Sequence, residues 1–427
     1  MGISVNQVGY QSRLDAVRQL LNSHGLQTSN LSPMAFDENY QYPFNNFLFK
    51  VELAIPASST SFPGTQPGTT AAPLSGVSAL VVKLSNPEAG LNNVNRIEND
   101  VAVQFLVRKS LVEAGLGPLV PAVYAWAPSP TTEVVNETGF GWIMSEWKSG
   151  IGLDSEFSSL GLEDKKQVLE QIAHILKAIQ AVKIPESVER FGGLTFDSDG
   201  RFISGEATLE RGKPVDSYAE WRSRKLYKSL ENASQNPVIQ GWKKGGLNAR
   251  IERFLSQGGP EETLAEVDLN QKGIIHGDFT TNNILFDKNA TRITALLDFD
   301  WAFISNPFEE FLFSFNDIGG NTGDDDIDKA ILRANFTIPP DKVDEEFAKR
   351  RNAAEAWNDA MRKSGAMSPN DIKGADKIRD ILRLQMLLCP FQLGNACQLK
   401  HMNDKEIEDL RAKGEADLSL WLEKYGF

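Results

Sequence analysis

The sequence predicts a two-lobed α+β protein, with a small β-rich N-lobe at residues 1–146 and a larger, mainly helical C-lobe at residues 147–427. Strand-like segments dominate the first part, and one long helix is expected among them. Amphipathic helical patterns dominate from about residue 161 onward. The chain has 427 residues, 41% of them apolar and 24% charged, which is enough for two substantial cores.

The net charge indicates which classes of partner are disfavoured, and the cysteine content indicates the redox compartment. A formal net charge of −13 disfavours nucleic acid and anionic membranes as main partners, although it could attract a cationic substrate. Two cysteines cannot make a disulfide framework, and they fit a reducing compartment. The N-terminal stretch lacks the features of a signal peptide, and no apolar run is long enough to span a bilayer. We therefore expect a cytoplasmic protein.

The N-lobe is expected to contain three strands and a helix. FNNFLFKVELAI alternates and carries aromatic and β-branched residues, which predicts a strand from about Phe47 to Ile55. VSALVVKLS predicts a second strand, with Lys83 in its apolar run, and FGWIMSEW predicts a third. The helix is expected between the last two strands, where apolar residues recur at helical spacing, namely Ile97, Val101 and Phe105.

Residues 56–75, between the first two strands, are rich in Ser, Thr, Pro and Gly. The segment has almost no apolar side chains with which to offset the entropy of ordering. We expect a flexible insertion in a hairpin, and its deletion should leave folding intact.

The C-lobe is expected to be helical, apart from short hairpins such as LTFDSDGRFISG. Its first helix, EDKKQVLEQIAHILKAIQAV, is amphipathic. The apolar face of this helix consists of Leu169, Ile172, Ala173, Leu176 and Ile179.

The segment GIIHGDFTTNNILFD places polar residues between two apolar runs, as in a capped turn or in a catalytic loop at residues 274–287. Asp278 is followed five residues later by Asn283, and fifteen residues after that by Asp298, in a metal-binding motif expected at 297–301. Phosphoryl transfer from ATP needs a carboxylate to orient the acceptor hydroxyl and take its proton. It also needs an Asn and a second Asp to hold Mg²⁺ on the phosphates. The pattern favours a kinase-type site over a capped turn.

Residues of the N-lobe could complete a nucleotide site. Lys83 lies in an apolar strand, where an unpaired ammonium group would be costly to bury, and Glu98 could be its partner. The alternatives are an edge-strand lysine facing solvent and a solvated glutamate on a helix face. IMSEW ends the third strand at the lobe boundary, where Met144, Ser145 and Glu146 could offer backbone hydrogen bonds to adenine. A plain strand end is the alternative.

The chain resembles the aminoglycoside phosphotransferase family, which is related to the choline and protein kinases. The matching segments, in the expected order, are VVKLS, RIENDVAVQFLVR, IMSEW, HGDFTTNNILFD and LLDFDWA, and the resemblance runs from about Asn45 to Phe315. It implies a protein-kinase-like fold, ATP or GTP as co-substrate, Mg²⁺ as cofactor, and a small hydroxyl-bearing acceptor. The roles it implies are catalytic for Asp278, metal-binding for Asn283 and Asp298, phosphate-positioning for Lys83 and Glu98, and structural for His276, whose ring would bond nearby backbone.

Several positions depart from the protein-kinase pattern. Gly277 stands where protein kinases carry Arg, and no A-P-E follows, which favours a small-molecule acceptor. No G-x-G-x-x-G precedes the first strand, so Asn45 and Asn46 could supply the turn and backbone N–H groups for the phosphates. Asp300 stands where the D-F-G motif of protein kinases has Gly. It could be a second carboxylate in the metal shell or an exposed acid, and the exposed acid is the favoured interpretation. Glu310 takes the place of the family's structural acid.

We therefore expect an enzyme that transfers the γ-phosphoryl group of ATP or GTP to a hydroxyl of a small molecule. A nucleotide-binding pseudokinase that acts as a scaffold, and a protein kinase, stay open as alternatives. A scaffold needs no catalytic base, so the presence of Asp278 beside the metal-binding residues favours the enzyme. The acidic run at 324–326 is expected to be a solvated loop or, less often, an acidic rim for a cationic substrate.

Overall fold

The computed structural model describes residues 5–34, 40, 42–129, 139–210, 212–322, 326–337 and 345–427. The chain divides into two compact units. The first comprises Met1–Pro214, Lys272–Gly320 and Asn352–Met367, and the second Val215–Gln271, Asn321–Arg351 and Ser368–Phe427. The α+β class is confirmed, while the lobe boundary at residue 146 stays a prediction.

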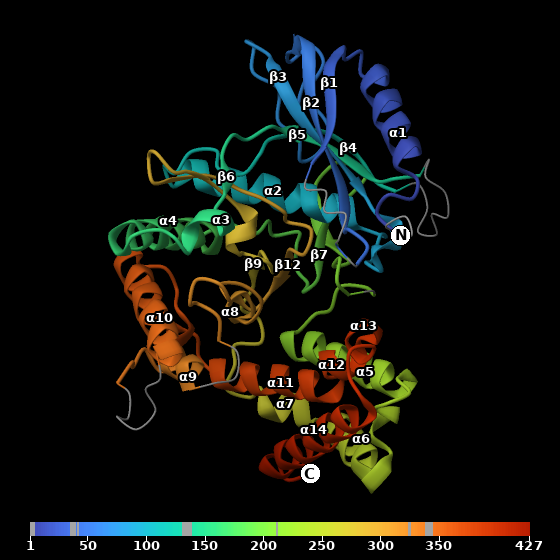
Figure 1. Ribbon diagram of the computed structural model, residues 1–427, viewed down its shortest axis with the longest axis vertical. Coiled ribbons are helices and arrows are strands. Elements are labelled where there is room, and N and C mark those ends of the chain that lie inside the picture. Colours follow the sequence, from blue (N-terminus) through green and yellow to red (C-terminus); the bar gives the residue numbers. More distant parts are fainter. Residues whose placement is uncertain are drawn as a thin grey trace. The chain divides into compact units, whose positions relative to one another are not determined.

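The first unit is built round a five-stranded antiparallel sheet in the order β1-β2-β3-β5-β4 (Figure 1). The strands are β1 (Thr28–Met34), β2 (Asn46–Ala57), β3 (Val77–Ser85), β4 (Val123–Ala127) and β5 (Trp142–Glu146). β2, β3 and β5 are the three strands that the sequence predicts. β1 and β4, the two edge strands, were not predicted.

Helices α1 (Tyr10–Ser23) and α2 (Arg96–Glu113) cover opposite faces of this sheet. Met144 of β5 lies in one core cluster with Leu14 and Val17 of α1, and its neighbour Ile143 lies in another with Val101 of α2. Successive residues of a strand point to opposite faces, so the two helices pack on different sides. Lys83 is opposite Ile143 in the β3–β5 register, and its side chain therefore points to the α2 face.

The remaining strands of the first unit frame the predicted catalytic loop. β9 (Gly273–Ile275) pairs with β12 (Phe303–Ser305), and β10 (Ile284–Asp287) pairs with β11 (Arg292–Leu296) and β6 (Ile151–Gly152). Helix α4 (Leu162–Gln180) buries all five apolar residues of its predicted face. The short elements are η1 (Pro87–Ala89), α3 (Asp154–Phe157), β7 (Gly193–Phe196), β8 (Phe202–Gly205), η4 (Thr281–Asn283), η5 (Pro307–Glu309) and α8 (Glu310–Phe313).

The second unit is helical in the residues that the structure describes. Its helices are α5 (Tyr218–Gln235), α6 (Leu247–Ser256), α7 (Gly259–Thr263), α9 (Asp326–Arg333), α11 (Ala375–Leu388), α12 (Phe391–Gly394), α13 (Ala396–Leu399) and α14 (Asp404–Lys424), with short turns η2 (Gln240–Trp242), η3 (Lys244–Gly246) and η6 (Pro369–Asp371). Helix α10 (Glu345–Ser364) contributes residues to both units. Buried tryptophans anchor the core, and the indole of Trp242 donates to the Leu388 carbonyl at 2.8 Å.

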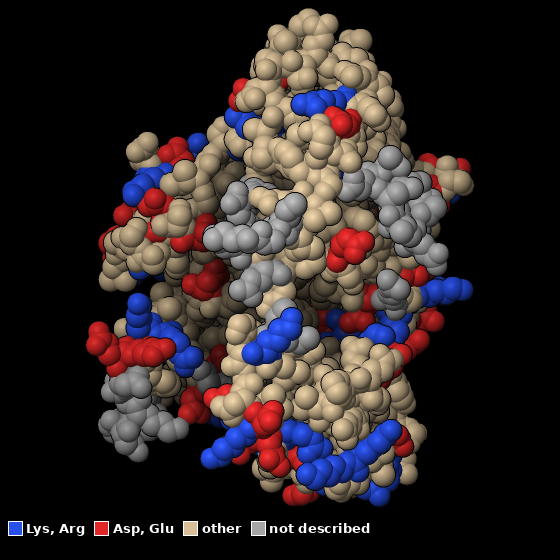
Figure 2. All heavy atoms as spheres, turned by 45° about the vertical axis from the view of Figure 1, so that its right-hand side comes forward, with Lys and Arg blue, Asp and Glu red and all other residues tan. Residues whose placement is uncertain are grey.

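Two surface properties bear on the expected partners. No helix among the described residues is both long and apolar enough to cross a bilayer. On the face drawn in Figure 2, Lys and Arg side chains lie among Asp and Glu side chains, so both signs of charge are presented there. Of the predicted acidic run, Asp324 and Asp325 lie outside the described residues, and Asp326 begins α9.

The prediction that residues 56–75 are flexible is wrong. Phe62 is only 1% exposed and stacks on Tyr124 of β4, with ring centroids 5.2 Å apart. The backbone N–H of Thr70 donates to the carbonyl of Val123 at 2.8 Å. β4 is an edge strand with unpaired backbone groups, and the segment covers that edge. A few fully buried side chains, together with these backbone bonds, offset the entropy of ordering the segment.

We expect Phe62→Ala to lower the free energy of unfolding by about 3–5 kcal/mol, because it leaves a cavity in the core. Leu74→Ala is the matched control, since Leu74 lies in the same segment but is 91% exposed. It should change stability by less than about 0.5 kcal/mol. Urea unfolding of both variants checks this, and equal small effects would restore the flexible interpretation.

Candidate active site

The catalytic loop begins with a turn that excludes a side chain. After β9, Gly277 adopts a left-handed backbone with φ of 79°. A Cβ atom at this position would lie 2.8 Å from the main-chain oxygen of Trp301. Both the torsion and the close approach favour glycine. An Arg such as protein kinases carry here would not fit this backbone.

The buried carboxylate of Glu310 holds the start of the loop. It accepts the backbone N–H of His276 at 2.7 Å and that of Gly277 at 3.2 Å, and it also accepts the hydroxyl of Ser314. Burial raises the pKa of Glu310, although these three donors act in the opposite direction. The contacts are those of a structural acid, as expected from its place after Pro307.

The ring of His276 is fully buried and bridges two backbone segments. Nε2 lies 3.0 Å from the carbonyl of Leu297, and Nδ1 lies 3.3 Å from the backbone nitrogen of Asp278. The first contact requires a proton on Nε2 and the second requires a bare Nδ1, so the ring is neutral. Burial lowers the pKa of His276 to about 4, which agrees with that state. The predicted bonds from this ring to nearby backbone are therefore present.

Asp278 and Asn283 lie side by side. The Asn283 amide donates to the Asp278 carboxylate at 2.9 Å and to the Asp278 carbonyl at 2.8 Å. Burial raises the pKa of Asp278, the bond from Asn283 acts in the opposite direction, and the charges of Asp298 and Asp317 raise the pKa further. Asp317 itself accepts the backbone N–H and the hydroxyl of Thr281, and so ties down the middle of the loop.

The partner of Lys83 is Asp100, not the predicted Glu98. Lys83 Nζ lies 2.7 Å from Asp100 Oδ2 and 3.3 Å from Asp298 Oδ1. Glu98 and Asp100 are two residues apart on α2, which turns their side chains about 200° apart around the helix axis. Only Asp100 faces β3. Burial would lower the pKa of Lys83, but the carboxylates of Asp100, Asp300 and Asp298 outweigh it and hold the pKa above its ordinary value.

Asp300 is not the exposed acid that the sequence favoured. Its residue is 2% exposed, and both carboxylate oxygens bond the guanidinium of Arg96, at 2.8 and 2.6 Å. Burial would raise the pKa of Asp300, but Lys83 and Arg96 outweigh it and lower the pKa to about 2. The Asn46 amide also donates to Asp300, and the Asn45 carbonyl accepts from Arg96. The Asn46 side chain and the Asn45 carbonyl are thus bonded within the protein, while phosphate binding by the backbone N–H groups of these two residues stays a prediction.

Asp298 and Asn283 fit a magnesium ion. The backbone N–H of Leu297 donates to the Asn283 carbonyl at 2.8 Å, which brings the two predicted ligands next to each other. The side chain of Asp298 is 40% exposed. The Asn283 amide nitrogen donates to Asp278, so the amide oxygen is the Asn283 side-chain atom that could bind a metal. Mg²⁺ takes oxygen ligands, commonly one or two from the protein with phosphates and waters completing the shell. No group of three or more His, Cys, Asp or Glu that could bind a metal occurs among the described residues.

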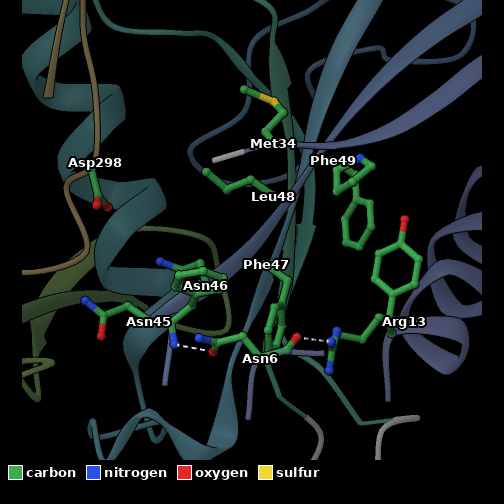
Figure 3. A pocket seen from close by; sticks show the side chains of 12 residues that line it. Asn6, Arg13, Met34, Asn45, Asn46, Phe47, Leu48, Phe49 and Asp298 are labelled. Atoms are coloured by element: carbon green, nitrogen blue, oxygen red, sulfur yellow. Dashed lines mark hydrogen bonds between the residues drawn. The ribbon is translucent and has the colours of Figure 1, made fainter. Parts of the chain in front are cut away.

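A cavity of about 210 Å³ lies between the start of β2 and Asp298 (Figure 3). Asn46 and Leu48 line it from β2, and Met34 from β1. Leu48 is opposite Lys83 in the β2–β3 register, so the two side chains share a face of the sheet. Asp298, which is paired with Lys83, lines the cavity directly.

The predicted hinge residues belong to a central strand. β5 lies between β3 and β4, and Val82 and Ala125 flank Met144 on the two sides. The Met144 side chain is fully buried, and the Glu146 carboxylate bonds Lys148 at 2.9 Å and the Ala122 N–H at 3.0 Å. Adenine binding by Met144, Ser145 and Glu146 stays a prediction.

Sequence reasoning missed three residues at this site, Arg96, Asp100 and Asp317. The first two are charged residues of α2 that are buried in the structure. A buried charge needs a partner, so an arginine at the first position of a largely buried helix was an available signal. Asp317 carried none, because its partner Thr281 is 36 residues away in an unrelated motif.

His276 should make stability depend on pH. Its pKa is about 4 in the folded protein and about 6.5 in an unfolded chain, so the unfolded state binds the proton more readily below pH 6.5. The stability that the neutral ring contributes is full above pH 6.5. It should be lost toward pH 4, by up to about 1.4 kcal/mol per pH unit.

His276→Gln keeps a donor for Leu297 and cannot titrate in this range. Urea unfolding at pH 7, 6 and 5 should show the advantage of the wild type over this variant shrinking as the pH falls. Comparing the two proteins at each pH removes the shared effect of the carboxylates. A difference that is independent of pH would contradict the assignment of a neutral, buried ring.

Comparison with known proteins places the chain in a family. Residues 74–349 match the model of the phosphotransferase enzyme family, whereas no curated protein sequence matches the chain significantly. Among solved structures, it is similar to a putative aminoglycoside phosphotransferase from Ralstonia eutropha JMP134, with 12% identity, a TM-score of 0.47, and coverage of 96% of this chain and 98% of that one. It is also similar to ADP-bound aminoglycoside phosphotransferase APH(2'')-Ib, with 13% identity, a TM-score of 0.45, and coverage of 96% and 98%. The family match spans well over half of the sequence, and the chain belongs to the phosphotransferase enzyme family.

Proposed function

We propose that this phosphotransferase moves the γ-phosphoryl group of ATP or GTP to a hydroxyl group of a small molecule. The observation that supports the proposal is the grouping of Asp278, Asn283 and Asp298. The first two side chains are hydrogen-bonded to each other, and the residue before Asp298 is bonded to the Asn283 carbonyl. A base and two metal ligands in one small region are the parts that phosphoryl transfer requires.

Each residue has a separate task in the proposed reaction. Asp278 orients the acceptor hydroxyl and takes its proton, while the bond from the Asn283 amide fixes the direction of the carboxylate. Asn283 and Asp298 would hold Mg²⁺, which supplies charge neutralisation on the phosphates when it is bound. Lys83, held by Asp100 at 2.7 Å, directs its ammonium group toward the phosphates.

The environment of Asp278 suits a general base. Burial raises its pKa above that of a free aspartate, and a higher pKa makes a carboxylate a stronger proton acceptor. The hydrogen bond from Asn283 acts in the opposite direction and limits this rise in the pKa. The catalytic loop therefore combines a partly desolvated base with a fixed orientation.

Adenine should bind just beyond β5. The strand is paired on both edges, so backbone groups that could bind adenine are expected after Glu146, at Trp147 and Lys148. The Ser149 carbonyl already accepts from the Thr294 hydroxyl. The proposed contacts therefore lie just beyond the predicted Met144, Ser145 and Glu146.

The proposed acceptor is a small molecule rather than a protein. Gly277 cannot carry the Arg with which protein kinases answer a phosphorylated activation loop, because a Cβ there would meet Trp301 at 2.8 Å. The segment after Asp298 leads within a few residues into β12 and α8, with no A-P-E sequence between them. The net charge of −13 favours a cationic acceptor.

Asp278→Asn separates an enzyme from a nucleotide-binding scaffold. The variant keeps the shape of the side chain and removes the base, so turnover should fall by about 100-fold or more. Nucleotide affinity should stay within about twofold, because the lost interaction acts in the transition state. Nucleotide titration and the rate of phosphoryl transfer, once an acceptor is found by screening hydroxylated metabolites, measure the two effects.

Asp199→Asn is the matched control, the same chemical change at an exposed turn between β7 and β8. It should leave both quantities unchanged. Wild-type turnover in Asp278→Asn would rule out the catalytic assignment and return the loop to a capped turn.

Asp298→Ala tests the metal site. Its partner in the proposal is the cation, so the variant should bind ADP equally well with Mg²⁺ and with EDTA, whereas the wild type should bind more tightly with Mg²⁺. Calorimetric titration under both conditions measures this without an acceptor. An undiminished Mg²⁺ effect in the variant would show that Asp298 is not a ligand.

A further inference from the structure

The carboxylate of Asp300 is enclosed by donors from three parts of the first unit. Arg96 of α2 donates from Nε to Oδ1 at 2.8 Å and from Nη2 to Oδ2 at 2.6 Å. Asn46 of β2 donates to Oδ2 at 3.1 Å, and the ammonium of Lys83 lies 3.8 Å from Oδ1. The Arg96 and Asp300 residues are 1% and 2% exposed. Neither side chain can reach a substrate, so their effect must act through other residues.

Arg96 also fixes the ends of two strands. Its Nη2 donates to the carbonyl of Asn45, just before β2, at 2.6 Å and to the side chain of Asn46 at 3.0 Å. Its Nη1 lies 3.4 Å from the carbonyl of Asn86, just after β3. One guanidinium therefore joins the start of α2, the strands that carry Leu48 and Lys83, and the segment that carries Asp298.

The backbone of Asp298 needs such support. Its φ of 59° is left-handed, a conformation that costs a residue other than glycine about 1 kcal/mol. On one side Leu297 is fixed, since its N–H donates to Asn283 and its carbonyl lies 3.0 Å from His276 Nε2. On the other side, Asp300 is hydrogen-bonded to Arg96 two residues further along the chain. The direction of the Asp298 carboxylate is set by these two anchors together with Lys83, whose Nζ lies 3.3 Å from Asp298 Oδ1.

We propose that Arg96 and Asp300 are positioning residues that hold Asp298 in the orientation that binds the metal. This inference rests on the proposed function, since it assumes that Asp298 is a metal ligand. Through Asn46, the pair also joins the first residue of β2 to the predicted metal-binding segment. Residues that orient a metal ligand typically change metal affinity about 10–100-fold when they are altered.

Two conservative variants test the pair. Asp300→Asn keeps the shape but removes the charge, and Arg96→Lys keeps the charge but cannot donate to both Asp300 oxygens and to Asn45 at once. The measurement is the ratio of ADP affinities with Mg²⁺ and with EDTA, which needs no acceptor and no turnover. We expect this ratio to fall at least about tenfold in Asp300→Asn, and less in Arg96→Lys. ADP affinity in EDTA should change little.

A purely structural role would give a different pattern. Breaking a buried ion pair destabilises the fold, so both variants should also unfold at lower temperature. Leu176→Ala in α4 is the stability control, because it removes buried core atoms from a residue with no part in the site. It should lower the unfolding temperature and leave the Mg²⁺ ratio unchanged.

The inference is overturned if the two variants lose stability as the control does while their Mg²⁺ ratio stays at the wild-type value. If the ADP affinity of the wild type is the same with Mg²⁺ and with EDTA, the metal site of the proposed function is overturned, and the positioning role with it. The Mg²⁺ ratio of the wild type therefore shows whether the metal site itself or only the positioning role has failed. If Asp300→Asn does not fold, Arg96→Lys still decides the question, because it retains both charges.

Discussion

The ammonium group of Lys83 is the constraint on which the rest of the first unit depends. It lies on the α2 face of a central strand, where burial without a partner would cost several kcal/mol. Its partners come from two distant segments, Asp100 on α2 and Asp298 and Asp300 after β11. Satisfying this one charge therefore fixes the position of a helix and of the predicted metal-binding segment relative to the sheet. The packing of the fold and the geometry of the site have the same electrostatic cause.

The count of charges in this cluster suits a cation-dependent reaction. Lys83 and Arg96 supply two positive charges and Asp100, Asp298 and Asp300 three negative ones, which leaves one negative charge. Asp100 and Asp300 are buried and bonded within the protein, whereas the Asp298 side chain is 40% exposed. The uncompensated charge is therefore presented at the only one of these three carboxylates that is open to solvent. A hard divalent cation bound there would neutralise this negative charge, and its remaining positive charge would face the nucleotide phosphates.

The sequence predicted the elements whose periodicity is strong and the site residues that lie in one local motif. β2, β3, β5, α2 and α4 were predicted, and so were the contacts of His276. Helix α1, which buries Leu14, Val17 and Leu21 at helical spacing, was not predicted. The choice between Glu98 and Asp100 depends on the rotation of α2 against β3, which no local pattern gives. The Arg96 and Asp300 pair joins residues 204 apart, and the ordered state of residues 56–75 depends on the unpredicted strand β4. These tertiary features were not predicted for one shared reason: each depends on contacts between residues that are far apart in the sequence.

In the proposed function, the reacting group of the predicted catalytic loop is distinct from the groups that hold it. Asn283 donates to the Asp278 carboxylate itself, while Glu310 accepts the N–H groups of His276 and Gly277 and the His276 ring bonds the Leu297 carbonyl. His276 is held neutral by burial, so its ring has no need to change protonation near neutral pH. In the proposed function, this division lets one aspartate act as a base while neighbouring groups hold its orientation.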